Sequence, residues 1–277
     1  MKDWLRESLS YFGLYSRLLR VKRSIVPACV PFGNHKSQYF LHYAPNRMTG
    51  DKVIVWVHGG GWNAGSPRSF DFVGQCVAGA GYHFVSLGYR LSPANKYPCQ
   101  IEDVCRGYQA AMQYLKDKGV DTSRVIVSGP SAGAHLASIL CTSRADQERY
   151  GADVSNVVGL IGVGGPYCFS PRPSLAVRLL LDQLFERGYD RTGAEPYALM
   201  TKSPMPMLLI HSRHDGLIDF SCAQRFCEKA QRIGNACELY EVEDRRNTHS
   251  WYTAGMFLMT REESRCLNRF FSWIEAL

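Results

Sequence analysis

The middle of the chain alternates short apolar runs with longer amphipathic stretches, and this alternation restricts the fold more than any other feature. We predict strands at 52–58, 83–87, 124–128, 157–163, 207–211 and 237–242. We predict helices at 70–80, 101–118, 132–141, 221–233 and 262–276. Apolar runs that alternate with helices indicate a mostly parallel sheet covered on both faces. Functional residues are then expected beyond the carboxyl ends of the strands.

The pattern predicts a single domain over residues 1–277 with two appendages. The chain has 277 residues, 45% of them hydrophobic, which is enough for one sizeable core. An N-terminal arm at 1–25 has apolar residues, among them Trp4 and Leu5, at roughly helical spacing. An insertion at 166–206 carries six prolines around the apolar stretch LAVRLLLDQLF. We predict that this insertion is either a small cap over the sheet edge or a connecting helix without substrate contact.

Charge and hydropathy argue against several classes of partner. The net charge of +7 is modest, and basic residues do not form long blocks with interleaved aromatic residues, so we expect no nucleic-acid partner. No signal peptide is visible and no apolar run could span a bilayer, so we expect no integral membrane segment. The basic arm leaves three alternatives open: contact with a membrane surface, a transit peptide, or a helix that covers the domain.

The cysteines point to the cytoplasm and away from metal binding. The chain has ten, but none forms a CxxC pair or has zinc-finger spacing. Reduced thiols in a cytoplasmic protein are the simplest interpretation. The apolar residues of the C-terminal helix, such as Phe270 and Trp273, either pack inside or form the face of a homodimer, and both alternatives remain open.

The strongest local signal is the motif GPSAG at 129–133. It follows a predicted strand and opens a predicted helix, which is the context of a nucleophile elbow. Such a turn exposes the serine hydroxyl, and flanking glycines relieve its steric cost. Ser131 is therefore the candidate nucleophile, and the backbone N–H of Ala132 is a candidate donor to an oxyanion.

A second glycine motif, HGGGW at 58–62, directly follows another predicted strand. Three consecutive glycines let backbone N–H groups approach a substrate carbonyl closely, as in the HGGG-type oxyanion loop. A phosphate-binding loop is the alternative, but the segment lacks the GxGxxG spacing and the Lys-Ser/Thr ending of a P-loop.

A serine nucleophile needs a base, and the base needs an acid that fixes its tautomer. Asp215 lies just past a predicted strand end, where the acid is expected. Asp219 is the runner-up, although its position also suits the cap of the following helix. His249 lies in a polar loop, and among the eight histidines it alone follows both the elbow and Asp215. The order Ser, acid, His is that of nucleophile-elbow hydrolases.

These motifs together resemble the α/β-hydrolases of the hormone-sensitive-lipase-like and bacterial carboxylesterase group, including its kynurenine formamidase branch. The resemblance rests on HGGGW at 58–62, GYRLSPANKYPCQIEDV at 88–104, GPSAGAHLA at 129–137, HSRHDGLID at 211–219 and THSW at 248–251. It implies an α/β-hydrolase fold with about eight strands, helices on both faces and a small cap. It also implies a triad of Ser131, Asp215 and His249 and an oxyanion hole formed by the backbone N–H groups of Gly60, Gly61 and Ala132. Finally, it implies structural hydrogen bonds behind the site from Tyr89, Arg90, Glu102 and Asp103.

We therefore predict a serine carboxylesterase that cleaves small esters in two acyl-transfer steps, with no metal and no cofactor. A short cap favours short acyl chains, and Trp62, Tyr167 and Phe169 are either walls of the substrate pocket or core packing. An arylformamidase that cleaves N-formylkynurenine is the enzymatic alternative, because it would use the same triad. A non-catalytic ligand-binding protein on the same fold is the alternative from another class.

Overall fold

The computed structural model describes residues 6–7, 13–14, 16–169 and 173–277, and an eight-stranded sheet forms its centre. In sheet order the strands are β1 (Ala28–Pro31), β2 (Tyr39–Tyr43), β4 (His83–Leu87), β3 (Val53–Val57), β5 (Val125–Pro130), β6 (Val157–Val163), β7 (Met207–Ser212) and β8 (Cys237–Val242). The pairings of β1 with β2 and of β2 with β4 are antiparallel, and the others are parallel. The predicted mostly parallel sheet is confirmed.

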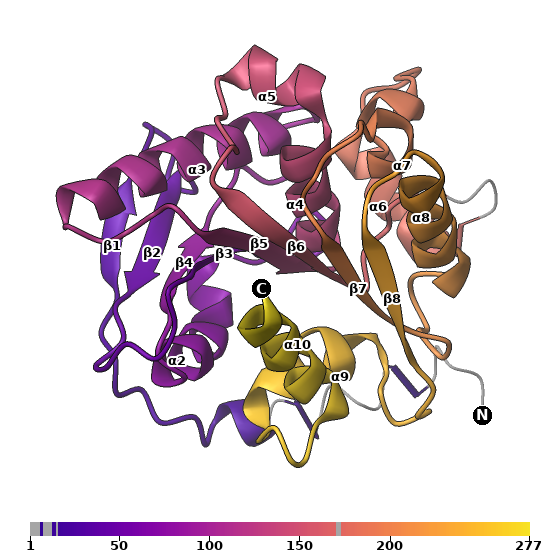
Figure 1. The fold of residues 1–277 in the computed structure, drawn as a ribbon. Coiled ribbons are helices and arrows are strands. Elements are labelled where there is room, and N and C mark those ends of the chain that lie inside the picture. Colours follow the sequence, from indigo (N-terminus) through magenta and orange to yellow (C-terminus); the bar gives the residue numbers. More distant parts are fainter. Residues whose placement is uncertain (1–5, 8–12, 15, 170–172) are drawn as a thin grey trace.

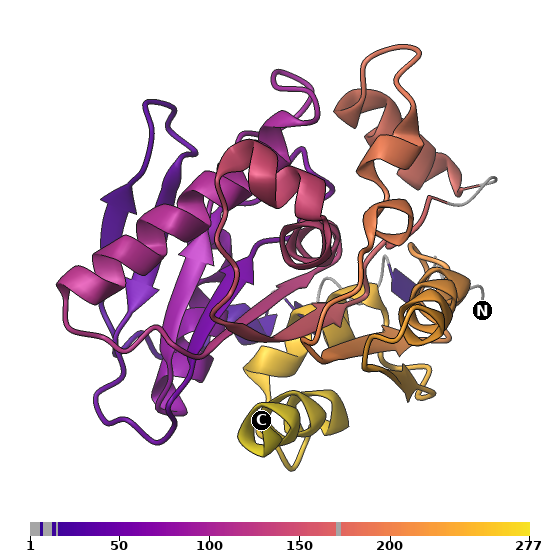
Figure 2. The same ribbon diagram turned by 45° about the horizontal axis from the view of Figure 1, so that its top comes forward.

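Helices cover both faces of this sheet (Figures 1 and 2). One face is covered by α3 (Cys99–Asp117), α4 (Ala132–Thr142) and α8 (Phe220–Arg232). The other is covered by α2 (Asp71–Gly79) and α10 (Arg265–Ala276). The shorter elements are η1 (Pro67–Phe70), α5 (Arg144–Tyr150), α6 (Leu175–Leu184), η2 (Arg191–Ala194), α7 (Pro196–Leu199), α9 (His249–Thr253) and η3 (Gly255–Leu258).

The predicted strands and helices all exist, whereas β1 and β2 are absent from the prediction. β1 has four mostly exposed residues and ends in a proline, so it lacks the apolar run that marks the buried strands. β2 is largely buried but short, with a histidine in its apolar sequence. These two strands extend the sheet by antiparallel pairing beyond β4, which the pattern of alternating strands and helices does not encode.

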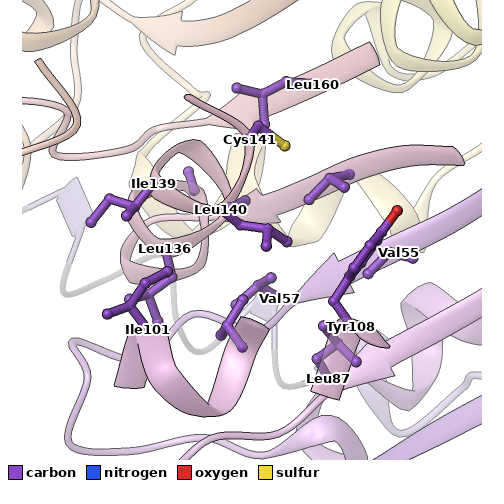
Figure 3. Packing of buried hydrophobic residues seen from close by; sticks show 14 of the residues in the cluster. Val55, Val57, Leu87, Ile101, Tyr108, Leu136, Ile139, Leu140, Cys141 and Leu160 are labelled. Carbon is purple, nitrogen blue, oxygen red and sulfur yellow. The ribbon is translucent and has the colours of Figure 1, made fainter. Parts of the chain in front are cut away.

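Strand β3 shows why the sheet needs helices on both faces. Its side chains alternate between two cores: Val53, Val55 and Val57 pack in one, and Ile54 and Trp56 in the other. Figure 3 shows part of the first core, where side chains from β3, α3, α4 and β6 meet. Full burial of each aliphatic side chain contributes roughly 1.5–3 kcal/mol, so the sheet and its helices stabilise one another.

The C-terminal helix packs inside the molecule. Phe270, Phe271 and Ile274 of α10 are buried in the second core, and Phe257 of η3 packs edge-on against Phe270. This answers the packing question raised by the sequence, while a homodimer stays a prediction. Within the described residues, no helix is long and apolar enough to cross a membrane. Much of the predicted arm helix, including Trp4 and Leu5, lies outside the described residues.

The insertion at 166–206 folds as α6, η2 and α7 beside the glycine loop. The side-chain amide of Asn63, just after that loop, donates to Gln183 at 2.8 Å, and the backbone N–H of Tyr97 donates to Leu184 at 2.9 Å. A Cβ built on Gly61 would lie 2.9 Å from Leu180, so α6 contacts the loop directly. These contacts support the predicted cap.

Candidate active site

The strand order reverses at β3, and this reversal brings the two glycine motifs together. β4 and β5 flank β3 on opposite sides, and β3 pairs with β5 in parallel, with Trp56 opposite Ser128. The segments that follow these two strands therefore leave the same edge of the sheet side by side. Open α/β sheets place their ligand sites at such a point.

Ser131 occupies the sharp turn between β5 and α4. Its φ and ψ are 52° and −122°, a region that non-glycine residues rarely adopt and that is typical of strained functional turns. The Ser131 N–H donates to the carbonyl of Val163 at 2.8 Å, and the Ser131 carbonyl accepts the N–H of His135 at 3.1 Å. Ala132 is the first residue of α4, so no helix carbonyl precedes it to accept its N–H. That N–H remains suited to an oxyanion.

The glycines of the elbow are needed because α4 starts against the end of β3. A Cβ built on Gly133 would lie 2.0 Å from the carbonyl oxygen of Val57, and one built on Gly129 would lie 2.6 Å from the same atom. Both distances are far below van der Waals contact with a backbone atom. The sequence GPSAG therefore permits a backbone approach that larger residues would prevent.

The glycine loop has conformations that favour glycine, and it lies against the candidate nucleophile. Gly60 and Gly61 have φ values of 117° and 58°. A Cβ built on Gly59 would lie only 3.6 Å from the Cβ of Ser131. The predicted oxyanion donors thus come from two segments that meet at Ser131.

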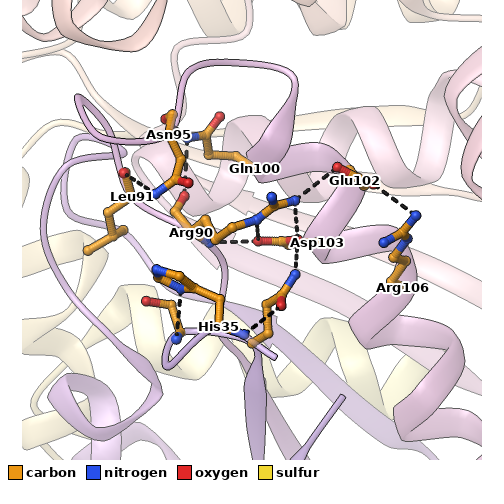
Figure 4. Close-up of polar contacts among 10 residues, drawn as sticks. His35, Arg90, Leu91, Asn95, Gln100, Glu102, Asp103 and Arg106 are labelled. Carbon is orange, nitrogen blue, oxygen red and sulfur yellow. Dashed lines mark hydrogen bonds and ion pairs between the residues drawn. The ribbon is translucent and has the colours of Figure 1, made fainter. Parts of the chain in front are cut away.

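The structural hydrogen bonds that the resemblance implies are present, and Figure 4 shows those around the buried Asp103. Asp103 is completely buried and accepts two hydrogen bonds from the Arg90 guanidinium and one from the Arg90 backbone N–H, all at 2.8 Å. Glu102 accepts a further bond from Arg90 at 2.9 Å. The hydroxyl of Tyr89 donates to the carbonyl of His58 at 3.0 Å, and the two rings stack with centroids 4.1 Å apart. Paired charges of this kind offset the cost of burial.

The side chain of Asp215, just past β7, is 0% exposed and fully hydrogen-bonded. One carboxylate oxygen accepts the backbone N–H groups of Leu217 and Ile218, both at 2.8 Å. The other accepts Nδ1–H of His249 at 2.6 Å and the hydroxyl of Tyr252 at 2.5 Å. Four donors thus compensate for burial of this charge.

Asp219, the alternative acid, caps helix α8 instead. It is the N-cap residue of α8, where its side chain accepts the N–H of Ser221 at 2.8 Å. An aspartate in this position satisfies an otherwise unpaired backbone donor of the first turn. The structure therefore brings Asp215, rather than Asp219, to His249.

The electrostatics of the site favour a charged acid and a basic imidazole. Burial alone would raise the pKa of Asp215, but the charge and hydrogen bond of His249, with smaller effects from His211 and Tyr252, lower this pKa to about 2. Burial alone would lower the pKa of His249, but Asp215 and then Glu7 raise it above the usual value. Because Nδ1 of His249 donates to Asp215, the neutral ring presents Nε2 as its acceptor.

The three aromatic residues predicted near the substrate occupy different surroundings. Trp62 is 2% exposed and its Nε1–H donates to Nδ1 of His135 at 3.3 Å, while Nε2 of that histidine bonds to the Ala194 carbonyl at 2.7 Å. Tyr167 is 0% exposed and packs on Phe226 with ring centroids 4.8 Å apart. Their proposed contact with substrate stays a prediction. Phe169, the third, lines a cavity next to Asp215.

This cavity has a volume of about 220 Å³ and lies between the insertion and the start of α8. Its lining combines apolar side chains, such as Phe169 and Val177 from the insertion and Leu217 from the loop after β7, with the carboxylates of Asp215 and Asp219. Of the predicted triad, Asp215 lines it, whereas Ser131 and His249 are not among its described lining residues. The cavity is therefore a side pocket that adjoins the acid.

Two residues of the site carry no clear sequence signal. Tyr252 follows His249 by one helical turn, so a shared face can be inferred only once α9 is known. Glu7 accepts the backbone N–H groups of His249 at 2.6 Å and Ser250 at 3.0 Å from the other end of the chain.

The ten cysteines are free thiols, and the described residues hold no cluster of three or more His, Cys, Asp or Glu side chains that could bind a metal ion.

The chain is similar to known proteins in both sequence and structure. Residues 41–230 match the model of the BD-FAE family. The esterase LipC of Mycobacterium tuberculosis is 28% identical over 66% of this chain and 49% of its own length. The isoprenylcysteine alpha-carbonyl methylesterase ICME of Arabidopsis thaliana is 26% identical over 90% of this chain and 60% of its own length. The chain thus spans about half the length of the curated relatives it matches.

A solved structure shows the same fold. The butyrate-bound esterase Est2 of Thermogutta terrifontis superposes with a TM-score of 0.70 at 22% identity, over 90% of this chain and 94% of that one. An eight-stranded, mostly parallel sheet with helices on both faces and an elbow after β5 is the α/β-hydrolase fold. The predicted fold class is therefore confirmed.

Proposed function

The chain belongs to the BD-FAE family of the α/β-hydrolase superfamily, and on that premise we propose that it is a serine carboxylesterase for small esters with short acyl chains. The observation that carries the proposal is the 2.6 Å hydrogen bond between His249 and the buried Asp215, together with the strained turn at Ser131. The names of the relatives LipC and ICME, which are an esterase and a methylesterase, support ester hydrolysis.

In the first step Nε2 of His249 takes the proton of Ser131 while Oγ attacks the ester carbonyl carbon. The carbonyl oxygen becomes an oxyanion, which the backbone N–H groups of Gly60, Gly61 and Ala132 stabilise. The imidazolium then protonates the alcohol oxygen, and the carbon–oxygen bond to the alcohol breaks. Asp215 keeps its charge throughout and stabilises the imidazolium.

In the second step His249 takes a proton from water, and the resulting hydroxide equivalent attacks the acyl-enzyme carbonyl. The same three N–H groups stabilise the second oxyanion, and the protonated His249 returns a proton to Oγ of Ser131. The carboxylic acid leaves and the free serine is restored. Every proton moves between Ser131, the substrate, water and His249, so the residues named suffice for the reaction.

The dimensions of the side pocket support a preference for short acyl chains. Its volume of about 220 Å³ is below the ~300–1,000 Å³ of pockets for drug-sized ligands. Phe169, Val177 and Leu217 give it an apolar wall for an alkyl group, and α6, to which Val177 belongs, also contacts the glycine loop. The structure of Est2 is a butyrate-bound one, and butyrate is itself a short acyl chain.

The first experiment is hydrolysis of p-nitrophenyl esters from acetate to palmitate. We expect turnover to peak at short chains and Ser131→Ala to lower kcat on the order of 10⁴-fold or more. Ser155→Ala, which changes an exposed serine, is the matched control. N-formylkynurenine hydrolysis without ester turnover would replace the esterase by a formamidase. No turnover of either, and no labelling of Ser131 by a fluorophosphonate, would favour a ligand-binding protein.

The pH profile tests His249 as the base. Its pKa lies above the usual value of about 6.5, and only the neutral ring accepts the serine proton. We therefore expect kcat/KM to rise tenfold per pH unit on the acid side and to level off above a midpoint higher than 6.5. A rate that stays flat from pH 5 to 8 would exclude His249 as the base.

A further inference from the structure

A carboxylate from the N-terminal arm lies buried beneath the candidate base. Glu7 is 3% exposed. One of its oxygens accepts the backbone N–H of His249 at 2.6 Å, and the other accepts that of Ser250 at 3.0 Å. These are the first two residues of α9, whose N–H groups have no acceptor within the helix. Hydrogen bonds to a charged acceptor of this kind are roughly twice as strong as neutral ones.

The arm is packed on α9 at several further points, so Glu7 is not an isolated contact. The guanidinium of Arg17 lies over the ring of Trp251, 5.6 Å from its centroid. A Cβ built on Gly255 would lie 2.9 Å from Leu14, and one built on Gly13 would lie 3.4 Å from Trp251. Figure 1 shows the indigo arm beside the yellow C-terminal segment that contains α9. The described residues of the arm therefore contact both α9, which carries His249, and η3, which follows it.

We propose that Glu7 is a positioning residue of the active site, which fixes the backbone of His249 while Asp215 fixes its ring. The inference rests on the proposed esterase function. Asp215 holds the ring through Nδ1, and Glu7 holds the main chain through the N–H of the same residue. These two anchors together restrict both the main chain and the ring of His249, and so the position of Nε2. Such pre-organisation raises kcat because the base needs no rearrangement to reach the serine proton.

Glu7 also adds a negative charge near the imidazole. The groups that face His249 are Asp215 and His211 from the end of β7, Tyr252 from α9, and Glu7 from the arm. Burial lowers the pKa of His211, so this histidine is neutral at neutral pH, and burial raises the pKa of Tyr252. Two carboxylates thus stabilise the imidazolium that forms during each proton transfer, one through the ring and one through the backbone.

The test compares Glu7→Gln with the wild type by two readouts. The amide keeps the shape of the side chain but removes its charge and replaces one acceptor by a donor. We expect kcat for a p-nitrophenyl ester to fall about tenfold with little change in KM. We also expect the imidazole of His249, titrated by NMR and assigned by its absence from His249→Ala, to lose about half a pH unit to one unit of its pKa. A residue that only stabilises the fold would lower activity without moving this titration.

Glu263→Gln is the matched control, because Glu263 is an exposed carboxylate that also accepts a backbone N–H, from Thr260 at 2.9 Å. It should leave both readouts unchanged. A Glu7→Gln protein whose His249 titrates as in the wild type, with an unchanged kcat, would overturn the proposal. The NMR titration needs no substrate, so it decides on Glu7 even if the wild type cleaves no ester. A thermal melt verifies that the Glu7→Gln protein is folded before its titration is compared with that of the wild type.

Discussion

The two halves of the site are built by different means. The nucleophile half consists of the glycine loop and the elbow, which follow the neighbouring strands β3 and β5. The two segments pack so closely that a Cβ built on Gly133 or Gly129 would lie 2.0 or 2.6 Å from the carbonyl oxygen of Val57. The acid–base half consists of the loop after β7, α9 and the arm, and side chains join these segments: Asp215 to His249, and Glu7 to the backbone of α9.

This difference predicts how each half fails. In the nucleophile half, even a methyl group added at Gly133 would displace α4 from β3, so we expect stability and activity to fall together. In the acid–base half the sheet does not depend on the hydrogen bonds, so activity falls while the fold persists. Variants in the two halves can therefore separate the contributions of geometry to stability and to catalysis.

The largest effect is expected for Asp215→Asn. The amide oxygen can still accept from Leu217 and Ile218, so its NH₂ group would face His249 and donate to Nδ1. The ring would then carry its proton on Nε2 and could not accept one from Ser131. We expect kcat to fall on the order of 10⁴-fold, as for the equivalent change in serine proteases, with a thermal melting temperature within a few degrees of the wild type.

Asp219→Asn is the matched change four residues along the chain. Asparagine caps helices about as well as aspartate, so we expect less than a threefold change in kcat and almost no change in stability. Equal losses in the two variants would mean that the loop as a whole, rather than the hydrogen bond to His249, sets the activity. A larger loss in Asp219→Asn would make Asp219 the acid.

The same contrast explains what the sequence could predict. Apolar runs and the glycines around Ser131 are local signals. They suffice to predict the central strands, in their order along the chain, and the sharp turn at Ser131. The contact between Glu7 and His249 joins residues 242 positions apart and leaves no periodicity or motif in either segment. Trp62 and Tyr167 illustrate the other limit, because composition alone does not separate an aromatic wall of a pocket from buried packing around His135 and Phe226.

Gly133→Ala tests the nucleophile half. The added Cβ would lie 2.0 Å from the carbonyl oxygen of Val57, so α4 must move away from β3. We expect the free energy of unfolding, measured in urea, to fall by about 3 kcal/mol or more, and activity to fall with it. Gly79→Ala, at the end of α2 where a Cβ meets nothing within 4 Å, is the control and should gain about 0.5 kcal/mol. A stable Gly133→Ala protein with normal kcat would refute the close backbone contact.

Tyr252→Phe is expected to have a much smaller effect than Asp215→Asn, and it shows how many donors Asp215 needs. The change removes the hydroxyl that donates to Oδ2 at 2.5 Å but leaves His249 and two backbone N–H groups in place. One lost hydrogen bond to a charged acceptor corresponds to roughly 1.5–3 kcal/mol, and water cannot enter this fully buried position easily. We expect a fall in kcat of about tenfold and a rise in the pKa of Asp215, because Tyr252 contributes to lowering it.

Tyr240→Phe on β8 is the control and should leave kcat unchanged. If Tyr252→Phe also left kcat and the pKa of Asp215 unchanged, His249 and the backbone donors would suffice to hold the carboxylate. The geometry of the acid–base half would then depend on the hydrogen bonds of Asp215 and Glu7 to His249, without help from Tyr252.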